Sequence, residues 1–199
     1  KVLDESKEIN DCGIEFSNPK IDTNKLVEWK NSVVRKLTGG LKALAKQRKV
    51  EVVTGTAKFS SSHKVVVATQ DGETSIEFEH AIIAVGSESV NLPFIPEDKR
   101  IFSSTGALEL ADIKGSMLVL GGGIIGLEMA TVYSALGVDV TVVEFMDQLM
   151  PGADLDLVKI LQKQMSKKGV KFLLKTKVTG MEAKKDGIYV SMEGAHKTD

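Results

Sequence analysis

The stretch 117–128, Met-Leu-Val-Leu-Gly-Gly-Gly-Ile-Ile-Gly-Leu-Glu, constrains the fold of this chain more than any other part of the sequence. Its first four residues form a short apolar run, typical of a strand buried in a parallel sheet, and the glycines begin where that strand would end. Gly121 permits a tight turn, Gly123 lets a ligand approach the backbone, and Gly126 lets the next helix pack closely on the strand. The pattern predicts a pyrophosphate bound at the N-terminus of a helix.

The residues that follow complete a βαβ unit of the dinucleotide-binding type. An apolar helical face follows the last glycine, Gly137 ends that helix, and residues 138–144 form an apolar strand that ends in Glu144. A carboxylate at this distance from the glycines accepts hydrogen bonds from both hydroxyls of an adenosine ribose. Residues 145–148 offer no Arg for a 2′-phosphate, so the pattern favours NAD over NADP. The alternative interpretation is a structural βαβ unit in which Glu144 binds no ligand.

Composition excludes several classes of protein. A chain of 199 residues with 42% hydrophobic and 27% charged residues is typical of a soluble globular protein, and its net charge of -1 offers no basic surface to nucleic acid or anionic membrane. The sequence has no apolar run of the roughly 20 residues that span a bilayer, and residues 1–10 lack a signal-peptide core, so we expect a cytoplasmic protein. The single Cys12 excludes an internal disulfide or a thiolate zinc site, so no metal site is expected, and Cys12 is predicted to be a buried or half-buried apolar residue.

The chain before residue 117 is predicted to contain a long helix and an antiparallel meander. Asp22 or Thr23 caps a helix whose apolar residues recur at three- and four-residue steps as far as Leu44, which predicts one buried stripe. Trp29 lies on this stripe, and we expect it to be packed in a core. The meander is predicted from short extended runs at residues 50–54, 58–59, 63–69 and 74–78.

A further buried strand is predicted at residues 80–85, and it leads to Gly86 and Ser87. Open α/β sheets bind ligands at the carboxyl ends of their strands, so these two residues are candidates for a ligand site. A capped helical turn is expected at residues 104–110, shortly before the apolar strand that precedes the glycines.

The chain after Glu144 is predicted to form a helix, a third strand and a hairpin. Residues 151–154 cap the helix, which ends at Gly169. Its inner face is predicted to consist of Leu155, Val158, Leu161 and Met165. The third strand and the two arms of the hairpin are predicted at residues 170–174, 177–183 and 188–192.

Several stretches, in order along the chain, resemble the pyridine nucleotide-disulfide oxidoreductases and, within that family, the bacterial dihydrolipoamide dehydrogenases. The matching stretches are residues 37–41, 81–87, 92–96, 121–129 and 186–190. The resemblance covers essentially the whole chain and implies an α/β fold with a Rossmann-like NAD-binding domain, which has a parallel sheet and an antiparallel meander. This domain would occupy residues 113–199 without its last strand, and residues 1–112 would be part of a similar FAD-binding domain.

The resemblance also implies an electron path and places residues along it. In this family dihydrolipoamide reduces an active-site disulfide, the dithiol passes electrons to FAD, and the reduced flavin gives a hydride to NAD⁺. The positions that match the pyrophosphate loop of the NAD site are Gly121, Gly122, Gly123, Ile124, Ile125, Gly126 and Leu127. The remaining matches are Glu144 at the ribose, Val178 beside the adenine, Ile124 over the flavin when NAD is absent, Glu128 near a flavin-side lysine, and Ala57, Gly86 and Ser87 at FAD.

The catalytic groups of that family match no residue of this chain. Its Cys-x-x-x-x-Cys pair and FAD fingerprint would precede Lys1, and its His-Glu pair would follow Asp199. The resemblance therefore implies an interior section of a homodimeric enzyme that acts on dihydrolipoamide carried by lipoyl domains of 2-oxo acid dehydrogenase complexes. We expect the 199-residue chain with added FAD to show no dihydrolipoamide:NAD⁺ turnover, and measurable turnover would contradict this. Two alternatives remain open, a non-catalytic NAD- or FAD-binding module and another disulfide reductase of the same family.

Overall fold

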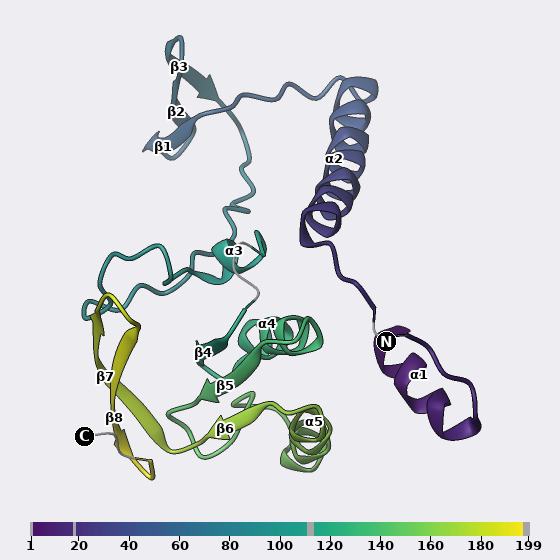
Figure 1. Ribbon diagram of the computed structural model, residues 1–199. Helices are drawn as coiled ribbons and strands as arrows, with labels where there is room; N and C mark the ends of the chain where they lie inside the picture. Colours follow the sequence, from purple (N-terminus) through teal and green to yellow (C-terminus); the bar gives the residue numbers. More distant parts are fainter. Residues whose placement is uncertain (1, 18, 111–113, 197–199) are drawn as a thin grey trace. The chain divides into compact units, whose positions relative to one another are not determined.

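The computed structural model describes residues 2–17, 19–110 and 114–196. Contacts group them into two compact units (Figure 1), a small unit, Asn24–Glu88, and a large unit that joins Lys1–Thr23 to Ser89–Asp199. The domain boundary expected after residue 112 falls within residues 111–113, outside the described residues. The assignment of the two predicted domains to FAD and NAD therefore stays a prediction.

The small unit contains the predicted helix and meander. Helix α2 spans Thr23–Gln47, as expected from its capping and apolar spacing. The strands of the antiparallel sheet β1-β2-β3 are Thr56–Ser61, Lys64–Thr69 and Gly72–Glu77. The extended run predicted at 50–54 is not a strand. The central strand β2 pairs along its whole length with β1 on one side and β3 on the other, so it has no edge left for a further strand.

The apolar stripe of α2 is exposed, which contradicts the buried stripe predicted from its periodicity. None of the α2 residues is buried, and Trp29, predicted to lie in a core, is 67% exposed. A helical stripe is buried only where a second apolar surface covers it. The three-stranded meander has too small an apolar surface for this, because Val67 is its only buried hydrophobic residue among those described.

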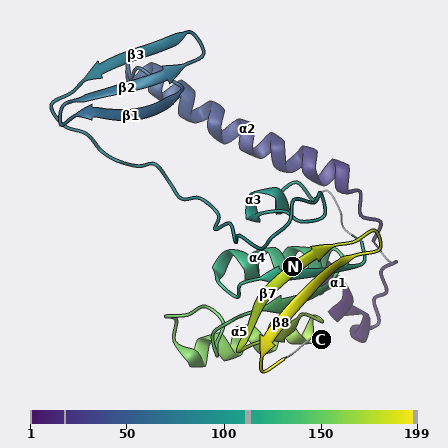
Figure 2. The same cartoon turned by 90° about the vertical axis from the view of Figure 1, so that its left-hand side faces the viewer.

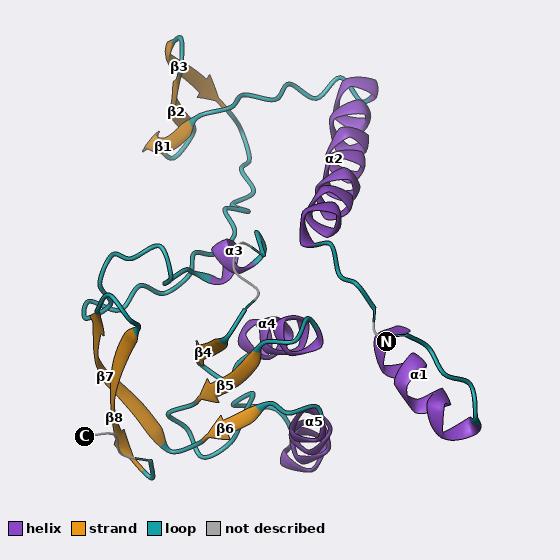
Figure 3. Cartoon of the chain, in the orientation of Figure 1, coloured by secondary structure: helices purple, strands orange, loops and turns teal. Residues whose placement is uncertain are grey.

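Residues 80–85 do not form the predicted buried strand. Figure 3 draws the chain between β3 and α3 as a loop, and Ile82 in this segment is 95% exposed. An extended segment becomes a strand only when its backbone groups pair with a neighbouring strand, and no described strand pairs with this one. Gly86 and Ser87 therefore do not lie at the end of a sheet strand.

The large unit begins with helix α1, Val2–Glu8, and the 3₁₀ turn η1, Ile9–Cys12. Cys12 is exposed, whereas the sequence predicted a buried or half-buried residue. It is the last residue of a single turn and is followed by Gly13, so this short segment has no core of its own to cover the thiol. Helix α3, Ser104–Ala107, confirms the expected helical turn, and Ser103 is its N-cap.

The βαβ prediction is confirmed in the large unit. The parallel sheet has the order β4-β5-β6, with strands Ser116–Leu120, Asp139–Val143 and Lys171–Leu173. The crossover helices are α4, Ile124–Ala135, and α5, Leu155–Lys167. Right-handed crossovers in one direction put both helices on one face of the sheet. Figures 1 and 2 show them there, with the hairpin of β7, Thr176–Ala183, and β8, Ile188–Gly194, on the other face.

The core of the large unit lies between the sheet and its helices. Buried residues of α4, β5 and α5 form one cluster, in which Tyr133 is almost fully buried and donates its hydroxyl hydrogen bond to the carbonyl of Ala107 at 2.8 Å. Val158 and Met165 face this core as predicted, but Leu155 is exposed. Leu155 is the first residue of α5, and the buried face of this helix begins only at Val158.

Candidate dinucleotide site

Gly121 turns the chain out of β4 and ties it to the neighbouring strand. Its φ of +101° is in the left-handed region, which a residue without Cβ adopts at little cost. Its N–H donates to the carbonyl of Val143, the last residue of β5, at 2.8 Å. The turn therefore delivers the chain to the carboxyl end of the sheet, where ligands of open α/β sheets bind.

The main-chain N–H and carbonyl of Gly122 are both hydrogen-bonded within the protein, and a buried side chain lies next to its Cα. Its N–H donates to Oε2 of Glu144 at 2.7 Å, and its carbonyl accepts from the N–H of Met150 at 2.8 Å. A Cβ at this position would lie 2.5 Å from a methyl carbon of Leu149, a fully buried side chain. Both main-chain groups of Gly122 are therefore used within the protein, and its contact with a dinucleotide stays a prediction.

The start of α4 presents free N–H groups to open space. Gly123 is the N-cap and makes no side-chain capping bond, and the N–H groups of Gly123, Ile124 and Ile125 have no acceptor among the described residues. The first backbone bond of the helix runs from the N–H of Leu127 to the carbonyl of Gly123. A Cβ at Gly123 would meet nothing within 4 Å. Orphan N–H groups and the helix dipole make a helix end of this kind suitable for an anion.

Gly126 sets the distance between α4 and the turn. A Cβ there would overlap the carbonyl oxygen of Gly121 and lie 3.3 Å from a methyl carbon of Val119 in β4. This is the close helix–strand packing predicted from the third glycine of the fingerprint.

Glu144 follows β5 and its carboxylate is fixed by two main-chain donors. The residue is only 8% exposed, Oε2 accepts from Gly122, and Oε1 accepts from the N–H of Met146 at 2.8 Å. Its own N–H donates to Leu173 of β6, and its carbonyl accepts from Thr176 of β7. Each carboxylate oxygen has further lone pairs, so the group retains acceptor capacity for a ligand.

The remaining predicted residues of the large unit surround this loop. Ile124 is 64% exposed, Ile125 is also exposed, and Leu127 is buried in the core. Val178 lies half-buried in β7, two residues after the Thr176 that bonds Glu144. Glu128 is exposed, but it is the fifth residue of α4 rather than part of its first turn, because the helix begins only at Ile124.

Ala57, Gly86 and Ser87, the predicted FAD contacts, lie in the small unit and are exposed. They are not part of the βαβ unit that carries the glycine loop. Their role at a flavin stays a prediction that rests on the resemblance.

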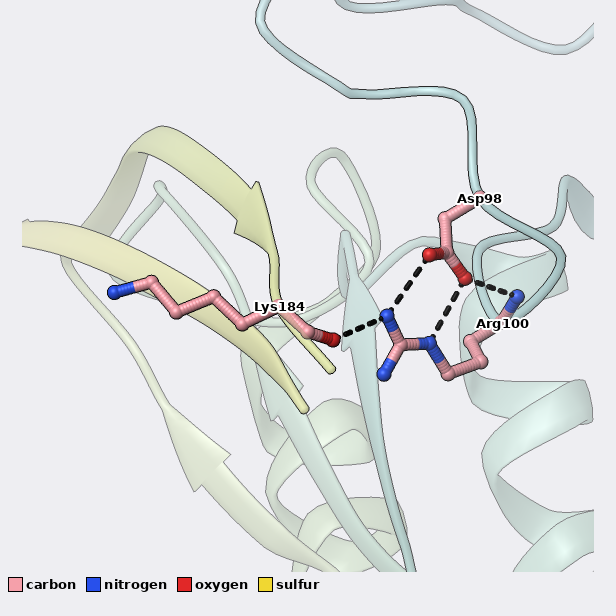
Figure 4. Close-up of polar contacts among 3 residues, drawn as sticks. All are labelled: Asp98, Arg100 and Lys184. Atoms are coloured by element: carbon pink, nitrogen blue, oxygen red, sulfur yellow. Dashed lines mark hydrogen bonds and ion pairs between the residues drawn. The ribbon is translucent and has the colours of Figure 1, made fainter. Parts of the chain in front are cut away.

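Sequence reasoning missed a cluster in the large unit, drawn in Figure 4. The guanidinium of Arg100 donates to both carboxylate oxygens of Asp98, at 2.9 and 2.8 Å, and to the carbonyl of Lys184 at 2.7 Å. The side-chain hydrogen bonds of Arg100 hold the pKa of Asp98 well below its usual range, and Asp98 raises the pKa of Arg100. An Asp-x-Arg turn is a weak local signal, and Lys184 contributes only its backbone.

Comparison with known proteins decides the family. The family model for pyridine nucleotide-disulphide oxidoreductases matches residues 2–199. The chain belongs to this family. It is 55% identical over 196 residues to a dihydrolipoyl dehydrogenase of Haemophilus influenzae, and 52% identical over 195 residues to a dihydrolipoyl dehydrogenase of Vibrio cholerae. Each alignment covers 98% of this chain and 41% of the relative, so the chain spans about two fifths of these relatives.

The fold of this oxidoreductase family is also found in solved structures. LpdA from Mycobacterium tuberculosis matches with a TM-score of 0.84 over 96% of this chain and 42% of its own, at 22% sequence identity. This likeness supports the mixed α/β fold alone.

Two further observations on the described residues concern metal-binding side chains and membrane-spanning helices. Among residues 2–17, 19–110 and 114–196, no group of three or more His, Cys, Asp or Glu side chains is placed to hold a metal ion. In the same part of the chain, every helix is too short or too polar to cross a bilayer.

Proposed function

We propose that the chain binds NAD, with the pyrophosphate on the N–H groups of Gly123, Ile124 and Ile125 and the adenosine ribose on Glu144. The observation that carries the proposal is that only some of the main-chain N–H groups in the glycine loop have acceptors within the protein. The N–H groups of Gly121 and Gly122 bind acceptors within the protein, whereas those of Gly123, Ile124 and Ile125 have no acceptor in the described part of the chain. A phosphate group fits these donors because they are unpaired, lie in the positive field of the helix dipole, and have no Cβ of residue 123 in front of them.

The chain's own residues hold and orient the dinucleotide in this proposal. Glu144 lies at the carboxyl end of β5 with its carboxylate fixed by Gly122 and Met146, so little freedom is lost when it accepts a ribose hydroxyl. Ile124, which is 64% exposed at the start of α4, would move aside when the nicotinamide enters. When bound, FAD would supply the electrons that reduce the nicotinamide. Ala57, Gly86 and Ser87 of the small unit are proposed as its backbone contacts.

We infer that the protein containing this section oxidises dihydrolipoamide through a disulfide and FAD and passes the electrons to NAD. The names of the relatives from Haemophilus influenzae and Vibrio cholerae support this inference. On the same ground we propose a cytoplasmic homodimer whose partners are the lipoyl domains of 2-oxo acid dehydrogenase complexes. The redox pair of this reaction is proposed to lie outside residues 1–199, since Cys12 has no partner cysteine in the sequence.

Preference for NAD over NADP is the first testable consequence. The buried carboxylate of Glu144 repels a 2′-phosphate, and residues 145–148 contain no arginine to compensate. Titration calorimetry of the 199-residue chain should give a Kd for NADP at least tenfold higher than for NAD, a difference of about 1.4 kcal/mol or more. Equal affinities would remove the role assigned to Glu144, and absence of binding to either nucleotide would refute the proposed site.

A further inference from the structure

The β7–β8 hairpin is joined at its base to the residues that hold Glu144. The N–H of Thr176 donates to the carbonyl of Glu144 at 3.0 Å, and the N–H of Lys175 donates to the carbonyl of Met146 at 2.9 Å. The second arm returns to this base, where the N–H of Ala195 donates to Lys175. The first residues of β7 therefore continue the wall of the proposed nucleotide site beyond Glu144.

Beyond this base the residues of β7 are mostly half-buried, and those of β8 alternate between half-buried and exposed. The hairpin is a two-stranded sheet of its own and does not extend the β4-β5-β6 sheet. An isolated two-stranded ribbon is marginally stable in water. Its register also shifts between Val178 and Gly180, and such a bulge bends the strand close to the base. A second attachment at the outer end therefore restricts the direction of the hairpin further.

Arg100 provides that attachment, as Figure 4 shows. Its Nη2 donates one hydrogen bond to Asp98 and one to the carbonyl of Lys184, which directly follows β7. The Nε–H and the main-chain N–H of Arg100 both donate to Oδ1 of Asp98, each at 2.9 Å. The segment before α3 and the outer end of the hairpin are thus joined by residues 84 positions apart.

The planar fork of arginine is what makes this contact possible. Two nitrogens on one edge of the guanidinium bind the Asp98 carboxylate, which fixes the plane of the group and aims the remaining Nη2 hydrogen at Lys184. A lysine carries its charge at a single nitrogen and cannot satisfy the carboxylate edge and the carbonyl in this arrangement. The carboxylate of Asp186 lies close enough to add to the field at Arg100.

We propose that Arg100, oriented by Asp98, is a positioning residue for the nucleotide site. It fixes the outer end of the β7–β8 hairpin, and through the hairpin it fixes the wall beside Glu144 against which the adenosine half of the ligand packs. This inference rests on the proposed function, because it assumes that the dinucleotide lies along Glu144. In this proposal Arg100 acts through the hairpin and does not contact the ligand.

The test compares Arg100→Lys and Asp98→Asn with the unchanged 199-residue chain. Titration calorimetry with ADP-ribose and with inorganic pyrophosphate separates the adenosine wall from the phosphate loop. We expect both variants to raise the Kd for ADP-ribose about three- to tenfold and to leave the Kd for pyrophosphate unchanged. Amide hydrogen exchange of residues 184–190 should become faster. Arg35→Lys, an exposed arginine of α2, is the matched control and should change none of these values.

The outcomes distinguish this inference from the proposal on which it rests. If the unchanged chain binds neither ADP-ribose nor pyrophosphate, the proposed function fails. If it binds both, and the variants exchange faster at the hairpin without a change in the Kd for ADP-ribose, Arg100 only stabilises the fold and the inference is overturned. An equal loss of affinity for ADP-ribose and pyrophosphate also overturns it. Asp98→Asn keeps the test decisive should Arg100→Lys fail to fold.

Discussion

Replacing Gly126 by alanine should destabilise the βαβ unit by about 3 kcal/mol or more, the upper part of the range for forcing extra atoms into a packed site. The added Cβ would overlap the carbonyl oxygen of Gly121, which is backbone and cannot rotate away, and it would also press on Val119. Relief requires α4 to move away from β4, which opens the loop that the helix supports. Thermal unfolding should show a midpoint lowered by roughly 6–12 °C for a chain of this size, together with loss of NAD binding.

Gly123→Ala is the informative partner of this variant because it separates binding from folding. A Cβ at Gly123 meets nothing, and its φ of -75° suits alanine, so the free energy of unfolding should change by less than about 0.5 kcal/mol. The same Cβ would stand where the pyrophosphate approaches, so the Kd for NAD should rise at least tenfold. Gly39→Ala in α2, also without a neighbour, is the control for the NAD affinity and should leave the Kd unchanged. A Gly126→Ala chain with an unchanged midpoint would contradict the close packing.

The second large effect is expected for Glu144→Ala, which should weaken both the fold and NAD binding. Removing the carboxylate leaves the N–H of Gly122 without an acceptor inside the protein, and an unsatisfied buried donor costs about 1–3 kcal/mol. The N–H of Met146 loses its acceptor as well, at a more exposed position. The NAD affinity should fall at least tenfold, because the ribose acceptor is lost and the glycine loop is no longer held.

Glu144→Gln tests whether one or both carboxylate oxygens matter. The amide oxygen can accept from one main-chain donor, but the amide nitrogen would then face the other N–H. We expect a loss of stability and affinity intermediate between those of the unchanged chain and Glu144→Ala, measured by urea unfolding and calorimetry. An alanine variant with an unchanged unfolding midpoint and an unchanged Kd would show that the two hydrogen bonds seen in the structure have no energetic role.

The βαβ unit was predictable because its signals are local. The apolar run before Gly121, the glycine spacing and the helix end at Gly137 each report on backbone geometry within a few residues. The structure confirms the parallel sheet, the two crossover helices and the hairpin at the predicted places. It adds that Gly121 and Gly122 are internal supports, a distinction the fingerprint cannot make because all main-chain N–H groups look alike in a sequence.

The wrong predictions share a different cause. Apolar periodicity in α2 and in residues 80–85 predicts that these side chains need burial, but it carries no information about whether a covering surface exists. In the structure Trp29 and Ile82 are exposed, because no described strand pairs with 80–85 and the small meander does not cover α2. The hydrogen bond from Arg100 to Lys184 was missed because it joins residues 84 positions apart and uses a main-chain carbonyl, which every residue possesses.

The most direct test of the central claim is a titration of the isotope-labelled chain with NAD, followed by the chemical shifts of its main-chain N–H groups. Binding as proposed should shift the amides of Gly123, Ile124 and Ile125 most strongly, since they gain charged acceptors. The amides of Gly121 and Gly122 should shift less, because they keep their bonds to Val143 and Glu144. Shifts confined to residues outside this loop, or no shifts at saturating NAD, would contradict the account.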